Sequence, residues 1–176
     1  MLRFVIGKMF YFTLGCLLPR SSFPLLGKYG KKFRAQCGKL MLAKTGVNIN
    51  IEKKARFSRR VTIGDNSGIG YNSYLQGKVE IGNNVMMAEN VRVFTTNHNT
   101  DRTDIPMCQQ GSQAERPVVI GDDVWICDSV IICPGTKIGN GVILGAGSVV
   151  RGNIPDYAIV AGNPAQIVRY RGKEDE

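Results

Sequence analysis

Large apolar residues recur at every sixth position over most of this chain. Read in sixes from Thr45, the sequence contains nine repeats that end at His98, and six further repeats run from Ile120 to Pro155. Every first position except Thr45 is apolar, and many second positions are glycine. Because an amphipathic helix places its apolar residues three and four apart, a period of six excludes it. The pattern predicts short strands joined by sharp corners.

Three such repeats can close one triangular coil of a stacked parallel β-helix. The large residue at position one is expected to point inward, and Gly or Asn to take the corner conformations. Small or β-branched residues at position five are expected to fill the space beside it: Val61, Val79, Val85, Val91, Val124, Val130 and Val142. Coils stacked in this way satisfy one another's backbone hydrogen bonds. The sequence therefore predicts an all-β repeat domain over residues 45–155 with about five triangular coils.

The two runs of repeats are out of phase. The 27 residues from Val93 to Ile120 are not a multiple of six, so an excursion has to leave the prism. Residues 99–119 are polar and contain two prolines, and we expect them to form an extruded loop, with residues 114–119 as one further imperfect strand in the alternative. A long loop in a regular repeat is usually functional. His98, the only histidine, lies at its root.

The flanking segments differ from the repeats in charge. The net charge is +9, and residues 1–51 hold nine Lys or Arg and no acidic residue, but no nucleic-acid-binding motif accompanies them. Residues 4–18 are almost entirely apolar, yet they are shorter than the roughly 20 residues that span a bilayer. We predict a basic, partly helical segment over residues 1–44. It either packs on the repeats or a neighbouring subunit, or contacts an anionic membrane surface peripherally. Residues 156–176 form a short C-terminal segment.

The five cysteines and the single histidine argue against a metal site. No CxxC pair is present, and one histidine leaves little to complete a zinc site. Reduced thiols suit a cytoplasmic protein. Cys127 and Cys133 stand at second positions of repeats, where glycine is usual, so packing of a small residue explains them better than a nucleophilic role.

Four segments together resemble a known family: NVRVFTTNHN, VVIGDDVWI, PGTKIGNGVILGAGSVV and IPDYAIVAGNPAQIVRYR. They are similar to the hexapeptide-repeat, left-handed β-helix acetyltransferases of the maltose, galactoside and xenobiotic group, and more closely to those of bacterial surface-polysaccharide gene clusters. The resemblance covers about residues 45–170. It implies a left-handed helix and a homotrimer with active sites between neighbouring subunits. It also implies that the reaction uses acetyl-CoA as co-substrate and needs no metal.

The resemblance carries over to individual residues. His98 falls on the family's catalytic histidine, and Trp125 on a tryptophan near the thioester end of acetyl-CoA. Ala146 falls on the residue whose backbone meets the pantetheine, and Arg169 on a basic residue near the CoA phosphates. Where relatives carry a lysine after the GAGS segment, this chain has Gly152, and the preceding Arg151 is expected to replace that lysine.

Two further departures concern the ligands. An earlier C-terminal arginine of the family is Gln166 here. The acceptor-binding Asn and Asp of sugar acetyltransferases have no counterparts between Gly68 and Gly77. These departures leave the reaction in place and the acceptor open.

The chemistry of acyl transfer fits the residues around the loop. A hydroxyl that attacks a thioester has to lose its proton, and an imidazole can accept that proton near neutral pH. We therefore predict His98 as the general base. The oxyanion needs a donor, either a backbone N–H or the amide of Asn97 or Asn99. Asp101 and Asp104 are predicted to orient His98 or contact acceptor hydroxyls, with a solvated polar loop as the alternative.

The sequence thus predicts an acetyl-CoA-dependent O-acetyltransferase that modifies a hydroxyl of a sugar or polysaccharide precursor. Two alternatives are an antibiotic O-acetyltransferase and a non-catalytic β-helix scaffold. A γ-type carbonic anhydrase on the same prism needs three histidines and is excluded, and a serine O-acetyltransferase is disfavoured because its usual extended helical domain is absent. The predicted location is cytoplasmic, either free or peripheral at the inner face of the membrane.

Overall fold

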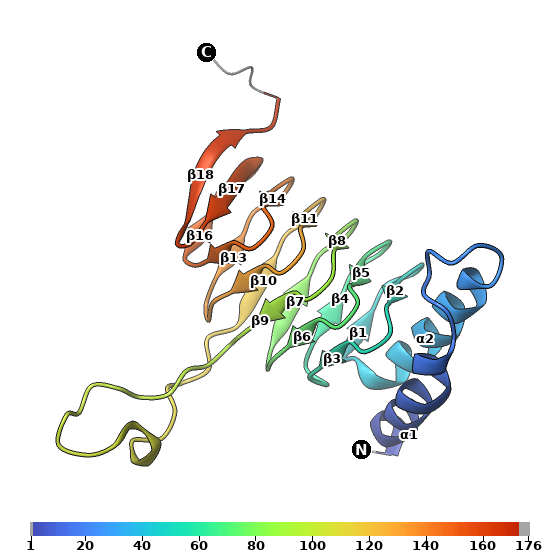
Figure 1. Cartoon of the computed structure of the whole chain (residues 1–176), viewed down its shortest axis with the longest axis horizontal. Helices are drawn as coiled ribbons and strands as arrows, with labels where there is room; N and C mark the ends of the chain where they lie inside the picture. Colours follow the sequence, from blue (N-terminus) through green and yellow to red (C-terminus); the bar gives the residue numbers. More distant parts are fainter. Residues whose placement is uncertain (1, 173–176) are drawn as a thin grey trace.

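A computed structural model describes residues 2–172, which form a parallel β-helix capped at one end by helices (Figure 1). The chain begins with α1 (Leu2–Phe10), continues through the π-helical turn η1 (Tyr11–Gly15) and then forms α2 (Gly27–Met41). Eighteen short strands follow. They form the three faces of a triangular prism, and we name these faces in the order in which the chain visits them.

The first face consists of β1 (Lys44–Thr45), β4 (Thr62–Ile63), β7 (Val79–Ile81), β10 (Val118–Ile120), β13 (Lys137–Ile138) and β16 (Asn153–Ile154). The second face consists of β2 (Asn50–Ile51), β5 (Gly68–Ile69), β8 (Met86–Met87), β11 (Trp125–Ile126), β14 (Ile143–Leu144), β17 (Ala158–Gly162) and the antiparallel β18 (Ala165–Tyr170). The third face consists of β3 (Arg56–Phe57), β6 (Tyr74–Leu75), β9 (Arg92–Val93), β12 (Ile131–Ile132) and β15 (Val149–Val150). The strands make five complete coils, as predicted, and β16 and β17 begin a sixth.

The predicted inward positions form the core. Lys44 lies opposite Thr62, 18 residues later, so three repeats of six make one coil. First-position residues such as Leu75 and Leu144 are at most 1% exposed, and all seven valines predicted at position five are buried to the same degree. Phe57 and Met87 are first-position residues that are only partly buried. Burial of these apolar side chains therefore stabilises every coil of the prism.

The corners need particular residues for two separate reasons. Asn48, Asn66 and Asn84 occupy the fourth position of their repeats and have φ angles of +53°, +55° and +57°, a left-handed conformation that Asn tolerates well. Their side chains also form a ladder from coil to coil, since each amide donates to the next at 2.9 and 3.3 Å. Second-position glycines are required by close approach. A Cβ on Gly70 would lie 1.5 Å from the carbonyl oxygen of Ala88.

The predicted extrusion is a long arm between β9 and β10 (Figure 1), and we define it as residues 96–117. Its two sides run antiparallel, with a bridge between His98 and Ser112 and a short 3₁₀ turn at Met107–Gln109. The arm ends earlier than the expected boundary at residue 119. Val118 already pairs with Val79 in the first face, so the imperfect strand considered for residues 114–119 forms only at its end.

The N-terminal segment packs on the protein's own first coil. Tyr11 and Met41 are buried there, and the Tyr11 hydroxyl donates a hydrogen bond to the carbonyl oxygen of Glu52. The Arg34 side chain is fully buried, donates to the carbonyl oxygen of Ile51 at 2.7 Å and pairs with the Glu52 carboxylate at 3.3 Å. Within residues 2–172, no helix is long and apolar enough to cross a membrane.

Candidate active site

His98 lies on the exposed side of the arm, near its root. Thr95, the last buried residue before the arm, accepts a hydrogen bond from the N–H of Arg116 at 2.7 Å. The carbonyl of Asn97 accepts a hydrogen bond from Gln113 N–H at 2.9 Å, and Asn99 N–H donates to the Gly111 carbonyl at 3.1 Å. Backbone contacts to the returning strand therefore lie on both sides of His98. The backbone of His98 is therefore fixed while its side chain is open to solvent.

Glu115 clamps the root of the arm to the coils. Its carboxylate accepts two hydrogen bonds from the Arg60 guanidinium at 2.7 and 2.8 Å. It also accepts from the Lys78 N–H at 2.9 Å and the Thr95 hydroxyl at 3.0 Å. Burial acts to raise the pKa of Glu115, but these donors outweigh it and hold that pKa below its ordinary value. No sequence pattern indicates this clamp, because Arg60, Lys78 and Glu115 lie far apart in sequence and are brought together only by the stacking of the coils and the return of the arm.

The distal half of the arm uses some of its polar groups internally. The Asn99 amide donates to the Gln110 carbonyl at 2.9 Å, and Arg102 Nε donates to Asp104 at 2.9 Å. The hydrogen bond from Arg102 lowers the pKa of Asp104 and keeps it ionised. Asn97 and Asp101 are exposed. Of the two predicted oxyanion donors and the two predicted acceptor contacts, Asn99 and Asp104 thus have structural partners in the arm, whereas Asn97 and Asp101 face solvent.

Three of the residues predicted to bind the co-substrate lie along the second face. Trp125 is 45% exposed, and its register neighbours on either side are Met86 and Ile143. Ala146 is exposed at the corner that follows β14, and Arg169 is exposed on β18. The apolar ridge of Met86, Trp125 and Ile143 is the kind of surface that binds a partner or ligand.

Arg151 lies at a different corner of the prism from the other residues predicted to bind CoA. It follows β15 at the corner between the third and first faces, which is also the corner from which the arm leaves after β9. His98 and Arg151 therefore share one corner, while Trp125, Ala146 and Arg169 belong to the second face. In Figure 1 the arm projects away from β8, β11 and β14, so one chain holds two separate halves of the predicted site.

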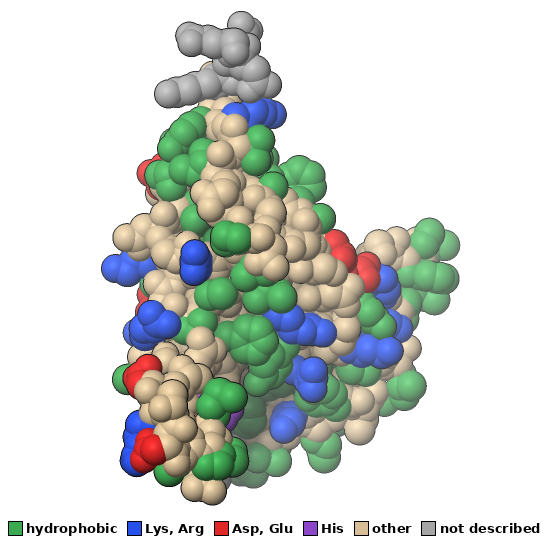
Figure 2. Space-filling model, turned by 60° about the vertical axis from the view of Figure 1, so that its left-hand side comes forward, with side chains coloured by type: hydrophobic (Ala, Val, Ile, Leu, Met, Phe, Trp, Pro, Cys, Tyr) green, Lys and Arg blue, Asp and Glu red, His purple; other side chains and the backbone are tan. Residues whose placement is uncertain are grey.

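The surface beside the arm is mixed in character. Figure 2, in which the arm comes forward, shows hydrophobic side chains on the adjoining body with Lys and Arg side chains among them. Cys127 follows β11 and is partly buried, and this burial raises the pKa of its thiol. A thiol that stays protonated is a poor nucleophile. Among residues 2–172, no three His, Cys, Asp or Glu side chains gather in a way that could hold a metal ion.

Proteins that this chain resembles in sequence include acetyltransferases. The family described as "Bacterial transferase hexapeptide (six repeats)" matches residues 60–95 and 117–152. The galactoside O-acetyltransferase of Escherichia coli strain K12 is 34% identical over 146 residues, which cover 78% of this chain and 68% of that protein. The putative colanic acid biosynthesis acetyltransferase WcaF of the same organism is 30% identical over 144 residues, 80% of this chain and 76% of that one.

A solved structure agrees with these relatives. Galactoside acetyltransferase in complex with coenzyme A superimposes with a TM-score of 0.77 and 30% identity, covering 96% of this chain and 80% of that one. The chain belongs to the hexapeptide-repeat acetyltransferase family. Three other curated relatives are 38–41% identical to this chain over the matched segments. Those segments cover only 38%, 60% and 50% of the relatives' own lengths.

Proposed function

We propose that this protein is an acetyl-CoA-dependent O-acetyltransferase that uses His98 as general base and acts on a hydroxyl of a sugar or polysaccharide precursor. The observation that carries the proposal is the position of His98, exposed on an arm that Glu115 clamps to a hexapeptide-repeat prism. Two relatives support the acceptor class by their names, a galactoside O-acetyltransferase and a colanic acid biosynthesis acetyltransferase.

The proposed site forms between neighbouring subunits of a homotrimer. The outward residues of the first face are mostly polar, among them Lys44, Glu80 and Lys137. Those of the second face include Met86 and Trp125, which are 60% and 45% exposed. An apolar ridge gains free energy when a second subunit or a ligand covers it. We infer that the arm of one subunit brings His98 over the second face of the next.

In that arrangement His98 first accepts a proton from the acceptor and later donates it to the leaving group. His98 takes the proton of the acceptor hydroxyl while the oxygen attacks the thioester carbonyl, and the C–O bond forms. The tetrahedral intermediate carries an oxyanion, for which the Asn97 amide is the proposed donor because the Asn99 amide already donates to Gln110. As the C–S bond breaks, the imidazolium returns the proton to the CoA sulfur.

The remaining predicted residues hold the two substrates. Trp125 and the backbone at Ala146 are proposed to line the pantetheine groove, and Arg169 and Arg151 to contact the CoA phosphates from two sides. Asp101 is proposed to accept hydrogen bonds from acceptor hydroxyls, while Asp104 orders the arm through Arg102. The protein would act in the cytoplasm, where its N-terminal segment could rest on the inner face of the membrane through its basic residues.

A direct assay tests the proposal. The protein is incubated with acetyl-CoA and a panel of sugars, sugar nucleotides and hydroxylated antibiotics, and free thiol release is followed. We expect thiol release that depends on a sugar acceptor and on His98. No thiol release with any acceptor, together with no thermal stabilisation by CoA, would favour a scaffold. Light scattering should give a trimer, and a stable monomer at micromolar concentration would contradict the proposed site.

A further inference from the structure

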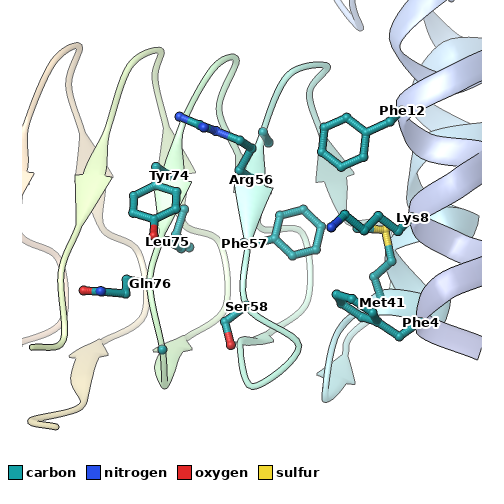
Figure 3. Close-up of a pocket in the computed structure, with 12 residues that line it drawn as sticks. Phe4, Lys8, Phe12, Met41, Arg56, Phe57, Ser58, Tyr74, Leu75 and Gln76 are labelled. Atoms are coloured by element: carbon teal, nitrogen blue, oxygen red, sulfur yellow. The ribbon is translucent and has the colours of Figure 1, made fainter. Parts of the chain in front are cut away.

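A pocket of about 290 Å³ separates α1 from the third face. Figure 3 shows Phe4 of α1 and Phe12 of η1 on one side, Phe57 of β3 on the other, and the buried Met41 of α2 nearby. Ser58, Tyr74 and Gln76 add polar groups on the strand side. The pocket therefore has an aromatic and aliphatic wall next to hydrogen-bonding groups.

Two cations line this pocket without an acidic residue beside them. In Figure 3 the Lys8 side chain extends from α1 toward Phe57, and the Arg56 side chain rises from β3. The Arg56 guanidinium lies 5.3 Å from the ring centroid of Tyr74. Among residues 2–172, neither Lys8 nor Arg56 forms an ion pair, and no acidic side chain lines the pocket. A pair of unneutralised cations at an apolar pocket favours an anionic ligand.

The pocket continues in two directions. On the outer side of α1, a more open hollow of about 560 Å³ is lined by Val5 and Met9 and shares Phe4, Lys8 and Phe12 with the pocket. Val5 and Met9 are each 55% exposed, so apolar surface extends beyond the pocket mouth.

On the other side the pocket reaches the root of the arm. Gln76 lines the pocket, and its side-chain oxygen accepts the N–H of Thr95 at 3.2 Å. Thr95 precedes His98 by three residues. The order along the surface is therefore an apolar hollow, two cations, hydrogen-bonding groups and then the arm that carries His98.

We infer from this order that the acceptor is an amphiphile, a sugar joined through a phosphate group to a hydrocarbon chain. The chain would lie along α1 against Phe4, Val5 and Met9, and the phosphate between Lys8 and Arg56. The sugar would extend past Gln76 toward the arm. A free neutral sugar would leave both cations and the apolar hollow unused. The inference rests on the proposed function and names the class of its acceptor.

The test measures binding without the reaction. Decyl phosphate, below its critical micelle concentration, is titrated calorimetrically into the full-length protein, with decyl glucoside and inorganic phosphate as partial probes. Decyl phosphate should bind saturably and at least about tenfold more tightly than either, because it alone carries both the chain and the anion. The Lys8→Gln and Arg56→Gln variants should each weaken it about five- to tenfold. Both side chains are exposed, so melting temperatures should stay near that of the wild type.

Lys137→Gln is the matched control, since Lys137 is exposed on the first face, and it should leave decyl phosphate binding unchanged. Equal binding of decyl phosphate and decyl glucoside would mean simple partition onto α1 and would overturn the inference. So would an absence of saturable binding, or equal losses in Lys137→Gln and Lys8→Gln. If decyl phosphate does not bind but a soluble sugar still releases thiol from acetyl-CoA, the inference fails and the proposed acetyl transfer stands.

Discussion

The coils and the arm are built in opposite ways. In the coils, side chains such as Val93, Ile126 and Ile132 are 0% exposed, and every strand pairs with strands above or below it. In the arm, none of residues 96–117 is buried. It is held by backbone pairing between its own two sides and by polar contacts at its root. Burial therefore determines the stability of the fold, while the arm has few buried contacts to lose and can be specialised for chemistry.

This contrast predicts that changes in the two regions affect different quantities. A substitution in a coil should lower the free energy of unfolding, and a substitution on the arm should lower the catalytic rate without unfolding the protein. The following variants test that separation, in decreasing order of expected effect.

His98→Ala should have the largest effect. Loss of the general base should lower kcat by about 10² to 10⁴, equivalent to about 2.7 to 5.4 kcal/mol in the barrier. Since His98 is exposed, its removal should leave the melting temperature and CoA affinity nearly unchanged. Steady-state kinetics and thermal melts on the same preparation check both halves. A variant that keeps more than about a tenth of the wild-type activity would show that His98 is not the base.

Leu144→Ala should give the opposite result. Leu144 is fully buried in β14, so the cavity left by the smaller side chain should lower the free energy of unfolding by about 2–5 kcal/mol. At a temperature where the variant is folded, kcat should stay within about twofold of the wild type. Denaturant titration measures the first quantity, with Lys137→Ala on the exposed first face as the control. A loss below about 1 kcal/mol would mean that the coils tolerate cavities better than a close-packed core does.

Glu115→Gln tests the junction between the two regions. The variant keeps the shape but loses the charge that pairs with Arg60, so the arm should loosen and kcat should fall about tenfold with little change in unfolding free energy. Arg60→Lys keeps the charge but loses the bidentate hydrogen bond, so its kcat should lie between those of the wild type and Glu115→Gln. If Glu115→Gln leaves kcat unchanged, the clamp does not position His98.

The same clamp predicts a pH dependence. The pKa of Glu115 is lower in the folded protein than in an unfolded chain. The contribution of the Glu115 carboxylate to holding the arm is therefore fully present above the ordinary carboxyl pKa. It is lost as pH falls through the lowered value, when the carboxylate becomes protonated. The protection factors of the arm amides, which correct for the slower intrinsic exchange at low pH, should therefore fall at acidic pH in the wild type relative to those of the coils. Glu115→Gln should already show fast exchange at neutral pH.

The sequence predicted the coils well because each residue's role repeats. The 18-residue period that aligns Asn48, Asn66 and Asn84 was present in the sequence, although the ladder between their side chains was not predicted. The start of the sixth coil was not recognised, because the corner after β15 is short. Val150 and Ile154 are four residues apart, where the repeat has six, and the register is lost there.

The site was less predictable because its parts come from distant segments. No periodic signal links Glu115 with Arg60, or Tyr11 and Arg34 with Glu52, since each contact depends on how separate segments meet in three dimensions. The pocket at Lys8 and Arg56 is of the same kind, because it exists only where α1 lies beside the third face. The resemblance supplied His98 and Trp125 and implied active sites between subunits, but the structure was needed to show that one chain holds His98 on the arm and Trp125 on the second face.

Trp125→Ala should have a smaller effect than His98→Ala, Leu144→Ala or Glu115→Gln, and it tests whether the coils bind acetyl-CoA. The indole is 45% exposed on β11, so its removal leaves no buried cavity, and the melting temperature should change little. If the ring covers the thioester end of acetyl-CoA, the KM for acetyl-CoA should rise about fivefold, or about 1 kcal/mol, with kcat within about twofold. Val119→Ala, an outward position on the first face, is the control and should leave that KM unchanged. A Trp125 variant that lowers kcat as strongly as His98→Ala would place the tryptophan in the chemical step and would remove the distinction between a coil that binds and an arm that reacts.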